Sequence, residues 1–506
     1  MDHTVLSLWD RIAHTEGATV RDIGGVHSRK SVSLGARRVA AALLGDRPSL
    51  DGDRVAIFVE PSVAFVHALL GVLGAGGTVT VLSPLHTKSE SNFLLADAGA
   101  IALIVSSQMD ERARELASEV RRVPASIGAD AHAPERAFVQ RTPEDPALQL
   151  YTSGTTGKPK GAVLSHGNLA VQMRLLGQAW GWSEADVLLH ALPLHHMHGL
   201  VIALMTALGA GACTHLTTFD APALFRAMHE ATVFMAVPTM YQKLLAALDA
   251  ASPEDRAHFE AGAAHLRLCT SGSAALPVTF GERWRQITGA YPLERFGMTE
   301  IGVGLTNPLV GERRPGHVGF PLPSVETRIV DEAFVDAEVG ELWVRGPSVF
   351  ERYHARPAET EQSFVAASPG ERPWFRTGDT VTRSGPDGAF KILGRSSVDI
   401  IKSGGYKLSA LEIEEALREH PAVAEVAVVG LPDEVWGERV VACVVPRPGQ
   451  AHACNETDLR AHAKSLLAAY KVPKEVRVLA ELPKNQLGKV IKPTLTASLR
   501  KESLPT

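Results

Sequence analysis

The sequence predicts an α/β fold in which a large N-terminal domain, residues 1–394, precedes a smaller, mobile α+β domain, residues 395–506. Three observations carry this prediction. Short apolar runs alternate with helical segments as far as Glu300, which indicates two α/β subdomains built on parallel sheets. Beyond Pro321 the apolar runs are separated only by turns, which indicates a small β subdomain. A chain of 506 residues also exceeds what one hydrophobic core supports.

The first subdomain is expected to alternate strand and helix. Residues 54–59, 78–82 and 101–105 are apolar or β-branched runs, so each is predicted to form a strand. Between the first two, Ser62 is placed to cap a helix that ends near Leu73, where a cluster of glycines follows. These glycines end a helix rather than open one and lack the G-x-G-x-x-G spacing, so a dinucleotide-binding fold is disfavoured.

In the second subdomain, a polar segment follows each of four predicted strands. The strands are expected over residues 187–192, 232–236, 266–269 and 292–294, and the second leads into a helix that reaches Leu248. In open α/β sheets, ligands bind beyond the carboxyl ends of the strands. The four polar segments are therefore expected to meet in one crevice.

The C-terminal part of the chain is predicted to contain mainly strands, with one capped helix. Ser409 and Glu412 form a predicted capping box for a helix that ends near His420. Strands are expected over residues 325–330, 340–345, 424–429 and 439–445. The first two belong to the small β subdomain and the last two to the α+β domain.

The composition is that of a soluble globular protein, with 45% hydrophobic and 21% charged residues. The net charge of −5 does not show the excess of basic residues that is typical of a nucleic-acid-binding protein. The N-terminus lacks the features of a signal peptide, and no apolar run is long enough to span a bilayer. The four cysteines lack metal-ligand spacing, as expected of reduced cysteines in a cytoplasmic protein. The sequence leaves the oligomeric state open.

One loop, residues 151–161, has the composition of a phosphate-binding site. It joins glycines, hydroxyls and lysines directly after a predicted buried strand over residues 147–150, and these groups together suit a polyphosphate. It differs from a Walker A loop, because only two residues separate Gly154 from Gly157 and because Pro159 keeps a helix from opening there. The residues expected to bind phosphate are Thr152, Ser153, Gly154, Thr155, Thr156, Gly157 and Lys160.

This loop resembles the phosphate loop of the adenylate-forming superfamily, which comprises acyl-CoA synthetases, luciferases and peptide-synthetase adenylation domains. The resemblance covers nearly the whole chain, and its motifs occur in the family's order. Three segments look most like those of malonyl-CoA synthetases, namely residues 190–200, 267–277 and 394–402. The resemblance implies an N-terminal domain that binds ATP and a carboxylate, and a C-terminal domain that carries a catalytic lysine.

The resemblance also implies roles for individual residues in binding ATP and Mg²⁺. Glu300 is implied to hold Mg²⁺, because a carboxylate beside bound triphosphate is a natural anchor for that ion. Lys489 is implied to stabilise the negative charge of the pentacoordinate α-phosphorus. The implied catalytic residues are Lys489, Thr299, Glu300 and His196. The other implied ATP ligands are Gly272, Ser273 and Ala274 at the adenine, Asp379 and Arg395 at the ribose, and Phe296, Gly297 and Met298 beside Thr299.

Coenzyme A is the expected thiol acceptor, because nothing in the sequence resembles an attached carrier domain. The resemblance implies that Trp436 and Tyr470 line the pantetheine tunnel and that the loop of Gly404 and Gly405 moves into the site for thioester formation. The alternative for Trp436 is a buried tryptophan of the core. Ser397 stands where the family's hinge usually has Asp or Lys, so the hinge residue is not assigned.

Malonate is the expected carboxylate substrate, with methylmalonate left open beside it. Cations near the substrate favour a second carboxylate over a long acyl chain. The residues expected to bind the substrate are His196, His198, Lys243, Arg283 and Ser271. No aspartate follows the predicted strand that ends at Ala236, which argues against an amino-acid substrate.

Two other functions remain as alternatives. The first is a short- or medium-chain or aryl acyl-CoA synthetase on the same fold. The second is a nucleotide-binding protein that has lost catalysis, and the presence of Thr299, Glu300, Asp379 and Lys489 argues against it.

Overall fold

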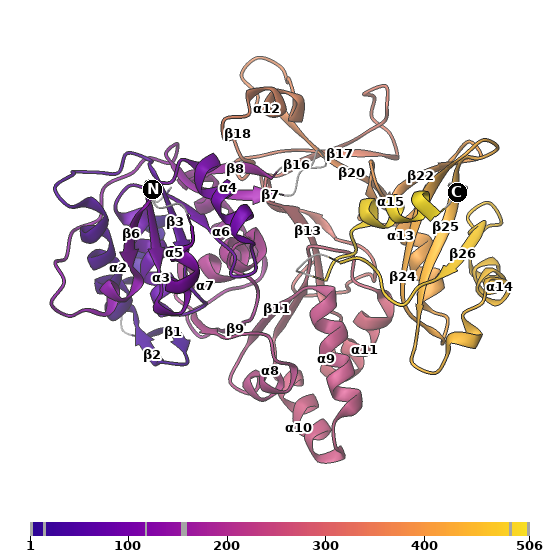
Figure 1. Ribbon diagram of the computed structural model, residues 1–506, viewed down its shortest axis with the longest axis horizontal. Helices are drawn as coiled ribbons and strands as arrows, with labels where there is room; N and C mark the ends of the chain where they lie inside the picture. The colour runs from indigo at the N-terminus through magenta and orange to yellow at the C-terminus, as the bar shows by residue number, and fades with distance from the viewer. Residues whose placement is uncertain (1–3, 14–16, 117–118, 153–158, 485–487, 503–506) are drawn as a thin grey trace.

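The computed structural model describes residues 4–13, 17–116, 119–152, 159–484 and 488–502, which form four β-sheets surrounded by helices (Figure 1). Two of the sheets are mainly parallel and two are mainly antiparallel, as the fold class predicts. No helix in the described ranges is long and apolar enough to cross a membrane.

A seven-stranded sheet forms the centre of the first subdomain, in the order β18-β8-β7-β4-β3-β5-β6. The strands from β3 to β7 pair in parallel, and β8 and β18 run antiparallel at one edge. The strands are Arg54–Phe58 (β3), Thr78–Val81 (β4), Ala102–Val105 (β5), Arg121–Pro124 (β6), Pro146–Thr152 (β7), Lys160–Ser165 (β8) and Arg352–Tyr353 (β18). The helices are Val5–Ala13 (α1), Arg29–Leu44 (α2), Val63–Gly74 (α3), Lys88–Ala98 (α4), Asp110–Arg114 (α5) and His166–Ala179 (α6), with 3₁₀ turns at Ser107–Met109 and Ala125–Ala129.

The second subdomain contains a nine-stranded sheet in the order β15-β14-β13-β12-β11-β9-β10-β1-β2. Its strands are Ala18–Asp22 (β1), Gly25–Ser28 (β2), Val187–His190 (β9), Cys213–Leu216 (β10), Val233–Ala236 (β11), Leu268–Ser271 (β12), Leu293–Met298 (β13), Gly302–Thr306 (β14) and Phe320–Pro321 (β15). Its helices are a π-helix over His198–Met205 (η3), Thr206–Gly209 (α7), Ala221–Met228 (α8), Pro238–Ala250 (α9), Pro253–Ala264 (α10) and Val278–Thr288 (α11). The N-terminal hairpin β1–β2 joins this sheet beside β10, a long-range pairing that the sequence did not predict.

The β subdomain has five strands, and β20 pairs with three of the others. They are Glu326–Val330 (β16), Val339–Arg345 (β17), Phe364–Val365 (β19), Trp374–Ser384 (β20) and Ala389–Arg395 (β21). The structure describes every residue between β16 and β17 and places no helix there, as the sequence analysis expected. A short helix, Pro357–Ser363 (α12), leads from β18 into β19.

The C-terminal region has its own five-stranded sheet, in which β26 pairs in parallel with β25. Its strands are Ile400–Ser403 (β22), Tyr406–Ser409 (β23), Val423–Asp433 (β24), Gly437–Pro446 (β25) and Glu475–Val478 (β26). Its helices are Ala410–Arg418 (α13), Glu456–Leu466 (α14) and Lys492–Glu502 (α15), with a 3₁₀ turn at Ala451–Ala453.

Two predicted helix caps are only partly correct. Ser62 does precede α3, but its hydroxyl donates to the carbonyl oxygen of Glu60 and does not cap the helix. Ser409 Oγ does accept from the backbone N–H of Glu412, at 3.2 Å. The Glu412 carboxylate pairs instead with Lys471 Nζ at 2.6 Å, so the reciprocal half of the capping box is not made.

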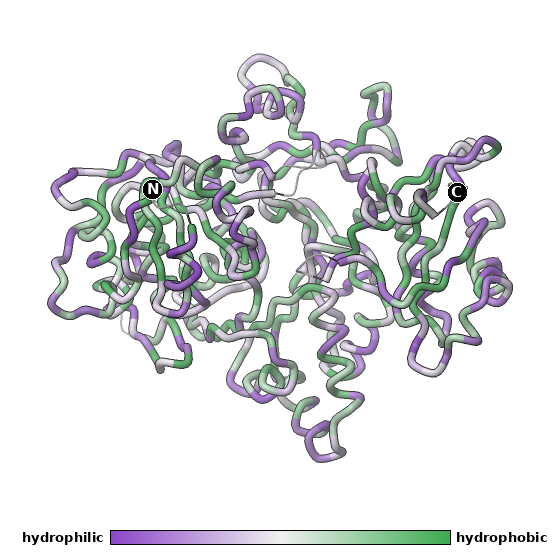
Figure 2. Tube along the Cα trace, in the orientation of Figure 1, coloured by the Kyte–Doolittle hydropathy of each residue, from purple (hydrophilic) through white to green (hydrophobic). Residues whose placement is uncertain are grey.

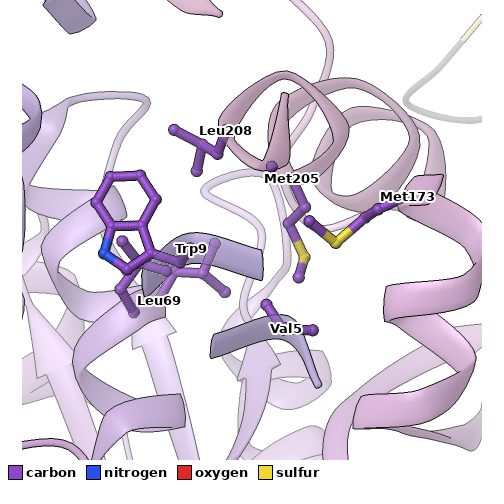
Figure 3. Close-up of a pocket in the computed structure, with 8 residues that line it drawn as sticks. Val5, Trp9, Leu69, Met173, Met205 and Leu208 are labelled. Carbon is purple, nitrogen blue, oxygen red and sulfur yellow. The ribbon is translucent and has the colours of Figure 1, made fainter. Parts of the chain in front are cut away.

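The buried apolar side chains form separate clusters on either side of residues 393–400. The clusters that include residues before Arg395 do not include any after it, within the described residues. Apolar stretches accordingly follow the strands of both regions (Figure 2). Under α1 the packing leaves an apolar pocket of about 10 Å³ lined by Val5, Trp9, Leu69, Met173, Met205 and Leu208 (Figure 3). A space of that size holds about one water molecule at most, so we assign it no ligand.

Candidate active site

Two strands bring the ends of the predicted phosphate loop together. Residues 153–158 lie outside the described residues, but Thr152 at the end of β7 pairs with Lys160 at the start of β8. The hydroxyl of Tyr151, directly before Thr152, donates to Asp97 Oδ2 over 3.0 Å. The loop therefore begins and ends on a fixed edge of the first sheet.

Glu300, the predicted Mg²⁺ ligand, is buried close to two cations. Its Oε1 accepts a hydrogen bond of 2.7 Å from the Tyr353 hydroxyl, and the Lys160 ammonium lies 5.4 Å from the centre of the Tyr353 ring. Burial raises the pKa of Glu300, whereas the Tyr353 hydrogen bond and the positive charges of Arg395 and Lys160 lower it. Two predicted ATP-site residues from distant segments, Lys160 and Glu300, thus lie around one tyrosine that the sequence analysis did not single out.

Asp379 and Arg395 face each other on neighbouring strands. They are directly paired in the register of β20 and β21, and Arg395 Nε lies 3.2 Å from Asp379 Oδ1. Burial raises the pKa of Asp379 to about 6, while the positive charges of Arg395 and Lys489 lower it. Lys489 of the C-terminal region is therefore close enough to act electrostatically on the ribose site predicted in the N-terminal region.

The predicted adenine segment borders a polar cluster beyond the end of β12. Ser273 adopts a left-handed conformation, with a φ of 69°, and its Oγ lies 3.3 Å from His198 Nδ1. A side chain at position 272 would collide with the guanidinium of Arg295, so only glycine permits this approach. Ser271 is buried, and its hydroxyl makes no hydrogen bond to the described residues.

The other predicted nucleotide ligands sit at the ends of the same strands. Four of them are partly buried residues at or just beyond the end of β13, namely Phe296, Gly297, Met298 and Thr299. Ala274 follows Ser273 and is exposed. The structure therefore brings the polar segments after β12 and β13 to one edge of the second sheet.

Arg295 is the residue of this cluster that the sequence analysis missed. Its side chain is 4% exposed, and its Nε and Nη2 atoms make no hydrogen bond within the described part of the chain. Burial lowers the pKa of Arg295 to about 9, which leaves the group charged at neutral pH. Its positive charge also lowers the pKa of His198. The signal was present in the sequence, since Arg295 stands directly before the Phe296–Glu300 motif.

Of the predicted substrate histidines, His198 lies near this cation, and both histidines are neutral. Burial lowers the pKa of His196 to about 4 and that of His198 well below the ordinary value. The rings of His195 and His196 are 4.1 Å apart, and His86 lies 5.7 Å from His195. Neutral imidazoles can donate or accept hydrogen bonds here, but they add no charge to the site.

Comparisons with known proteins agree with this geometry. Residues 10–354 match the AMP-binding enzyme family, and residues 412–489 match the AMP-binding enzyme C-terminal domain. The chain therefore belongs to the AMP-binding enzymes. It is similar to the mitochondrial malonate–CoA ligase ACSF3 of Mus musculus, with 40% identity over 501 residues, covering 91% of this chain and 84% of the relative.

Two solved structures of this family bear on the arrangement of the domains. ATP-bound MatB from Rhodopseudomonas palustris superimposes with a TM-score of 0.88 at 32% identity, over 100% of both chains. A malonyl-CoA ligase in a ternary product complex with methylmalonyl-CoA and AMP gives 0.66 at 36% identity, over 92% of this chain and 96% of the other. Because the more similar sequence superimposes less well, sequence divergence does not account for the difference.

The residues predicted to bind CoA lie together on the C-terminal region. The backbone N–H of Gly404 donates to the carbonyl oxygen of Trp436 at 2.8 Å, and the rings of Tyr406 and Tyr470 stack 4.5 Å apart. Gly405, in the turn between β22 and β23, has a φ of 83°. The Trp436 side chain is 40% exposed, which does not fit the alternative of a core tryptophan. Its role in CoA binding stays a prediction.

The two cations predicted for the substrate are more exposed than Arg295. Lys243 on α9 is exposed, with its Nζ 5.5 Å from the centre of the Phe219 ring. Arg283 on α11 pairs with Asp249 at 2.6 Å, and both side chains are about half exposed. Their contribution to substrate binding stays a prediction, and Arg295 is the cation that the structure buries beside His198.

Proposed function

We propose that this AMP-binding enzyme forms malonyl-CoA from malonate and CoA, with ATP cleaved to AMP and pyrophosphate through a malonyl-adenylate intermediate. The observation that carries the substrate assignment is Arg295, a buried guanidinium without an ion-pair partner among the described residues. Burying an unpaired charge costs several kcal/mol, on the order of the penalty for each ion of a buried pair. The distal carboxylate of malonate would supply the missing partner. The name of the mouse relative agrees with this substrate.

In the first half-reaction, one carboxylate oxygen of malonate attacks the α-phosphorus of ATP, and pyrophosphate leaves. Asp379 is suited to accept hydrogen bonds from the ribose hydroxyls, and Arg395 fixes its carboxylate from the neighbouring strand. Lys489 is a point cation that can stabilise the charge gathering on the α-phosphate oxygens. Thr299 lies one residue before Glu300 on the phosphate side of the site. We assign these four residues to ATP binding and adenylation.

Glu300 fits a role in holding Mg²⁺. It is a buried carboxylate near Lys160, and no group of three or more His, Cys, Asp or Glu side chains in the described ranges could hold a metal ion by itself. Mg²⁺ commonly takes one or two protein carboxylates together with phosphate oxygens and water. The ion would neutralise phosphate charge when bound, and the Tyr353 hydroxyl would orient Glu300 toward it.

In the second half-reaction, the CoA thiol sulfur attacks the acyl carbon of malonyl-adenylate, and AMP leaves. Gly404, Gly405, Trp436 and Tyr470 are the proposed CoA-binding residues. Their exposure in this structure fits a surface that faces the site only after the C-terminal region has moved. Methylmalonate is a second proposed substrate, because the product complex of the related malonyl-CoA ligase holds methylmalonyl-CoA.

We propose a cytoplasmic location, since all four cysteines are buried and free.

Pyrophosphate release, measured across a series of acids with CoA present, tests the assignment. Malonate should exceed acetate, propionate, butyrate, octanoate and benzoate in kcat/KM, and product analysis should find malonyl-CoA. A preference for octanoate or benzoate would instead support the alternative of a medium-chain or aryl acyl-CoA synthetase. Absence of pyrophosphate release with every acid would support a nucleotide-binding protein without catalysis.

A further inference from the structure

Helix α11 begins without a cap from its own segment. The residue before it is Pro277, which has no side-chain acceptor, and the helix makes no side-chain cap hydrogen bond locally. The first N–H groups of a helix need acceptors, and Ser, Thr, Asp or Asn usually supplies one. An acceptor from elsewhere in the chain can therefore stabilise α11 by accepting a hydrogen bond from one of its first N–H groups.

The acceptor comes from the C-terminal region. Glu415 Oε1, on α13, accepts a hydrogen bond of 2.8 Å from the backbone N–H of Val278, the first residue of α11 and 137 positions earlier. The Glu415 carboxylate is 27% exposed and also pairs with Arg418 Nη1 at 2.6 Å. A carboxylate at a helix N-terminus gains from the helix dipole and from a charge-assisted hydrogen bond. This contact holds α13 against the second subdomain.

The contact exists in the arrangement that brings Lys489 to the ATP site. Lys489 acts electrostatically on Asp379, and a Cβ at the neighbouring Gly488 would lie 2.9 Å from Thr239 Cγ2 on α9. In the same arrangement Trp436 remains 40% exposed. The Glu415–Val278 bond therefore belongs to the same arrangement as Lys489 near Asp379, in which the residues proposed to bind CoA are exposed.

A second contact crosses between the same regions but is weaker. Glu332, in the turn after β16, lies 3.1 Å from both Lys402 Nζ and Lys407 Nζ. All three side chains are more than half exposed, so water and salt screen the pairs. The Glu415 carboxylate is less exposed to water and accepts a hydrogen bond from a backbone N–H, so the contact of Glu415 with Val278 is the stronger of the two contacts.

We propose that Glu415 is a positioning residue for the first half-reaction, acting across the two regions by capping α11. The proposal rests on the two-step reaction proposed above. It predicts that loss of the Glu415 carboxylate shifts the C-terminal region away from the adenylation arrangement. Adenylation should then slow, while transfer of the acyl group to CoA should be unchanged or faster.

The test measures the two half-reactions separately in the full chain. Pyrophosphate release with malonate reports adenylation, and thioester formation from supplied malonyl-adenylate reports the second step. Glu415→Ala should slow adenylation on the order of tenfold, and Glu415→Gln should slow it less, because the amide oxygen still accepts from Val278. Glu456→Gln is the matched control, since Glu456 pairs with Arg460 within α14 and lies 45% exposed.

Each outcome decides the matter. A selective loss of adenylation in Glu415→Ala, with Glu456→Gln equal to wild type, supports the proposal. Equal losses in both half-reactions, or no loss in either, would overturn it, and thermal unfolding of each variant shows whether an equal loss comes from misfolding. If wild type itself fails to transfer the acyl group to CoA, the proposed function fails and not this inference.

Discussion

Replacing Arg295 with methionine should reverse the preference for a dicarboxylate. Arg295 is 4% exposed, so solvent screens its pairing with a bound carboxylate very little. Removing one partner of a buried ion pair costs about 3–5 kcal/mol, because the other charge is left buried and unpaired. The kcat/KM for malonate should therefore fall by a factor on the order of 10² to 10⁴. The kcat/KM for butyrate should rise, because butyrate no longer leaves a cation unpaired.

The assay is pyrophosphate release with malonate and with butyrate, each over a range of concentrations. Lys243→Met and Arg283→Met serve as matched variants, since each removes one exposed cation from a neighbouring helix. If Arg295 binds the distal carboxylate, the two helix variants should stay within a few-fold of wild type. Thermal unfolding of Arg295→Met should occur no lower than in wild type, because replacing a buried charge by an apolar side chain of similar length is often neutral or stabilising.

Three results would refute this reasoning. The first is an Arg295→Met variant that keeps the preference of wild type for malonate. The second is a loss of activity that is equal for malonate and butyrate, which would indicate a role in the chemistry common to both acids. The third is a large loss of kcat/KM for malonate in Lys243→Met or Arg283→Met with no loss in Arg295→Met. That result would favour Lys243 or Arg283, the cations predicted from the sequence, as the ligand of the distal carboxylate.

Four further predictions concern the two half-reactions. Lys489→Ala should lower adenylation on the order of a hundredfold and spare thioester formation from supplied malonyl-adenylate, and equal losses would contradict its role. Glu300→Gln should raise the Mg²⁺ concentration needed for half-maximal pyrophosphate release, and an unchanged Mg²⁺ titration would exclude the metal role. Trp436→Ala should raise the KM for CoA with adenylation nearly intact, whereas loss of both steps with a lower unfolding temperature would point to the core. The raised pKa of Asp379 is about 6, and a protonated carboxyl accepts hydrogen bonds from the ribose poorly. The KM for ATP should therefore rise as the pH falls below 6. A KM for ATP that stays constant between pH 5 and pH 7 would contradict this.

The strands and the convergence of their polar ends could be predicted from sequence because both depend on local signals. The apolar runs at 54–59 and 232–236 became β3 and β11 within one or two residues, and the polar segments after β9 and β12 do meet, where Ser273 contacts His198. Hydrophobic alternation and turn residues carry that information in the chain itself. The position of the polar segments then follows from the rule that ligands bind beyond the carboxyl ends of parallel strands.

Contacts between distant segments carry no comparable local signal. The β1–β2 hairpin was not predicted from the sequence, and only the three-dimensional structure places it beside β10. Glu415 looks like any charged residue on the surface of α13, and its bond to Val278 depends on how two regions are placed. Arg295 was missed for a related reason, because its neighbour Glu294 is equally buried and the sequence does not show which of the two faces the ligand.

The charges of the buried site explain why one cation suits malonate better than several would. Burial keeps His196 and His198 neutral at pH 7, so Arg295 is the charged group that the structure buries near His198. A cation at the distal carboxylate stabilises bound malonate and its transition state equally, which raises affinity without slowing attack. A cation at the reacting carboxylate would stabilise it before attack and lower its reactivity toward the α-phosphorus. Neutral histidines can orient that carboxylate by hydrogen bonds while leaving its charge available, and we therefore propose that Arg295 binds the distal carboxylate.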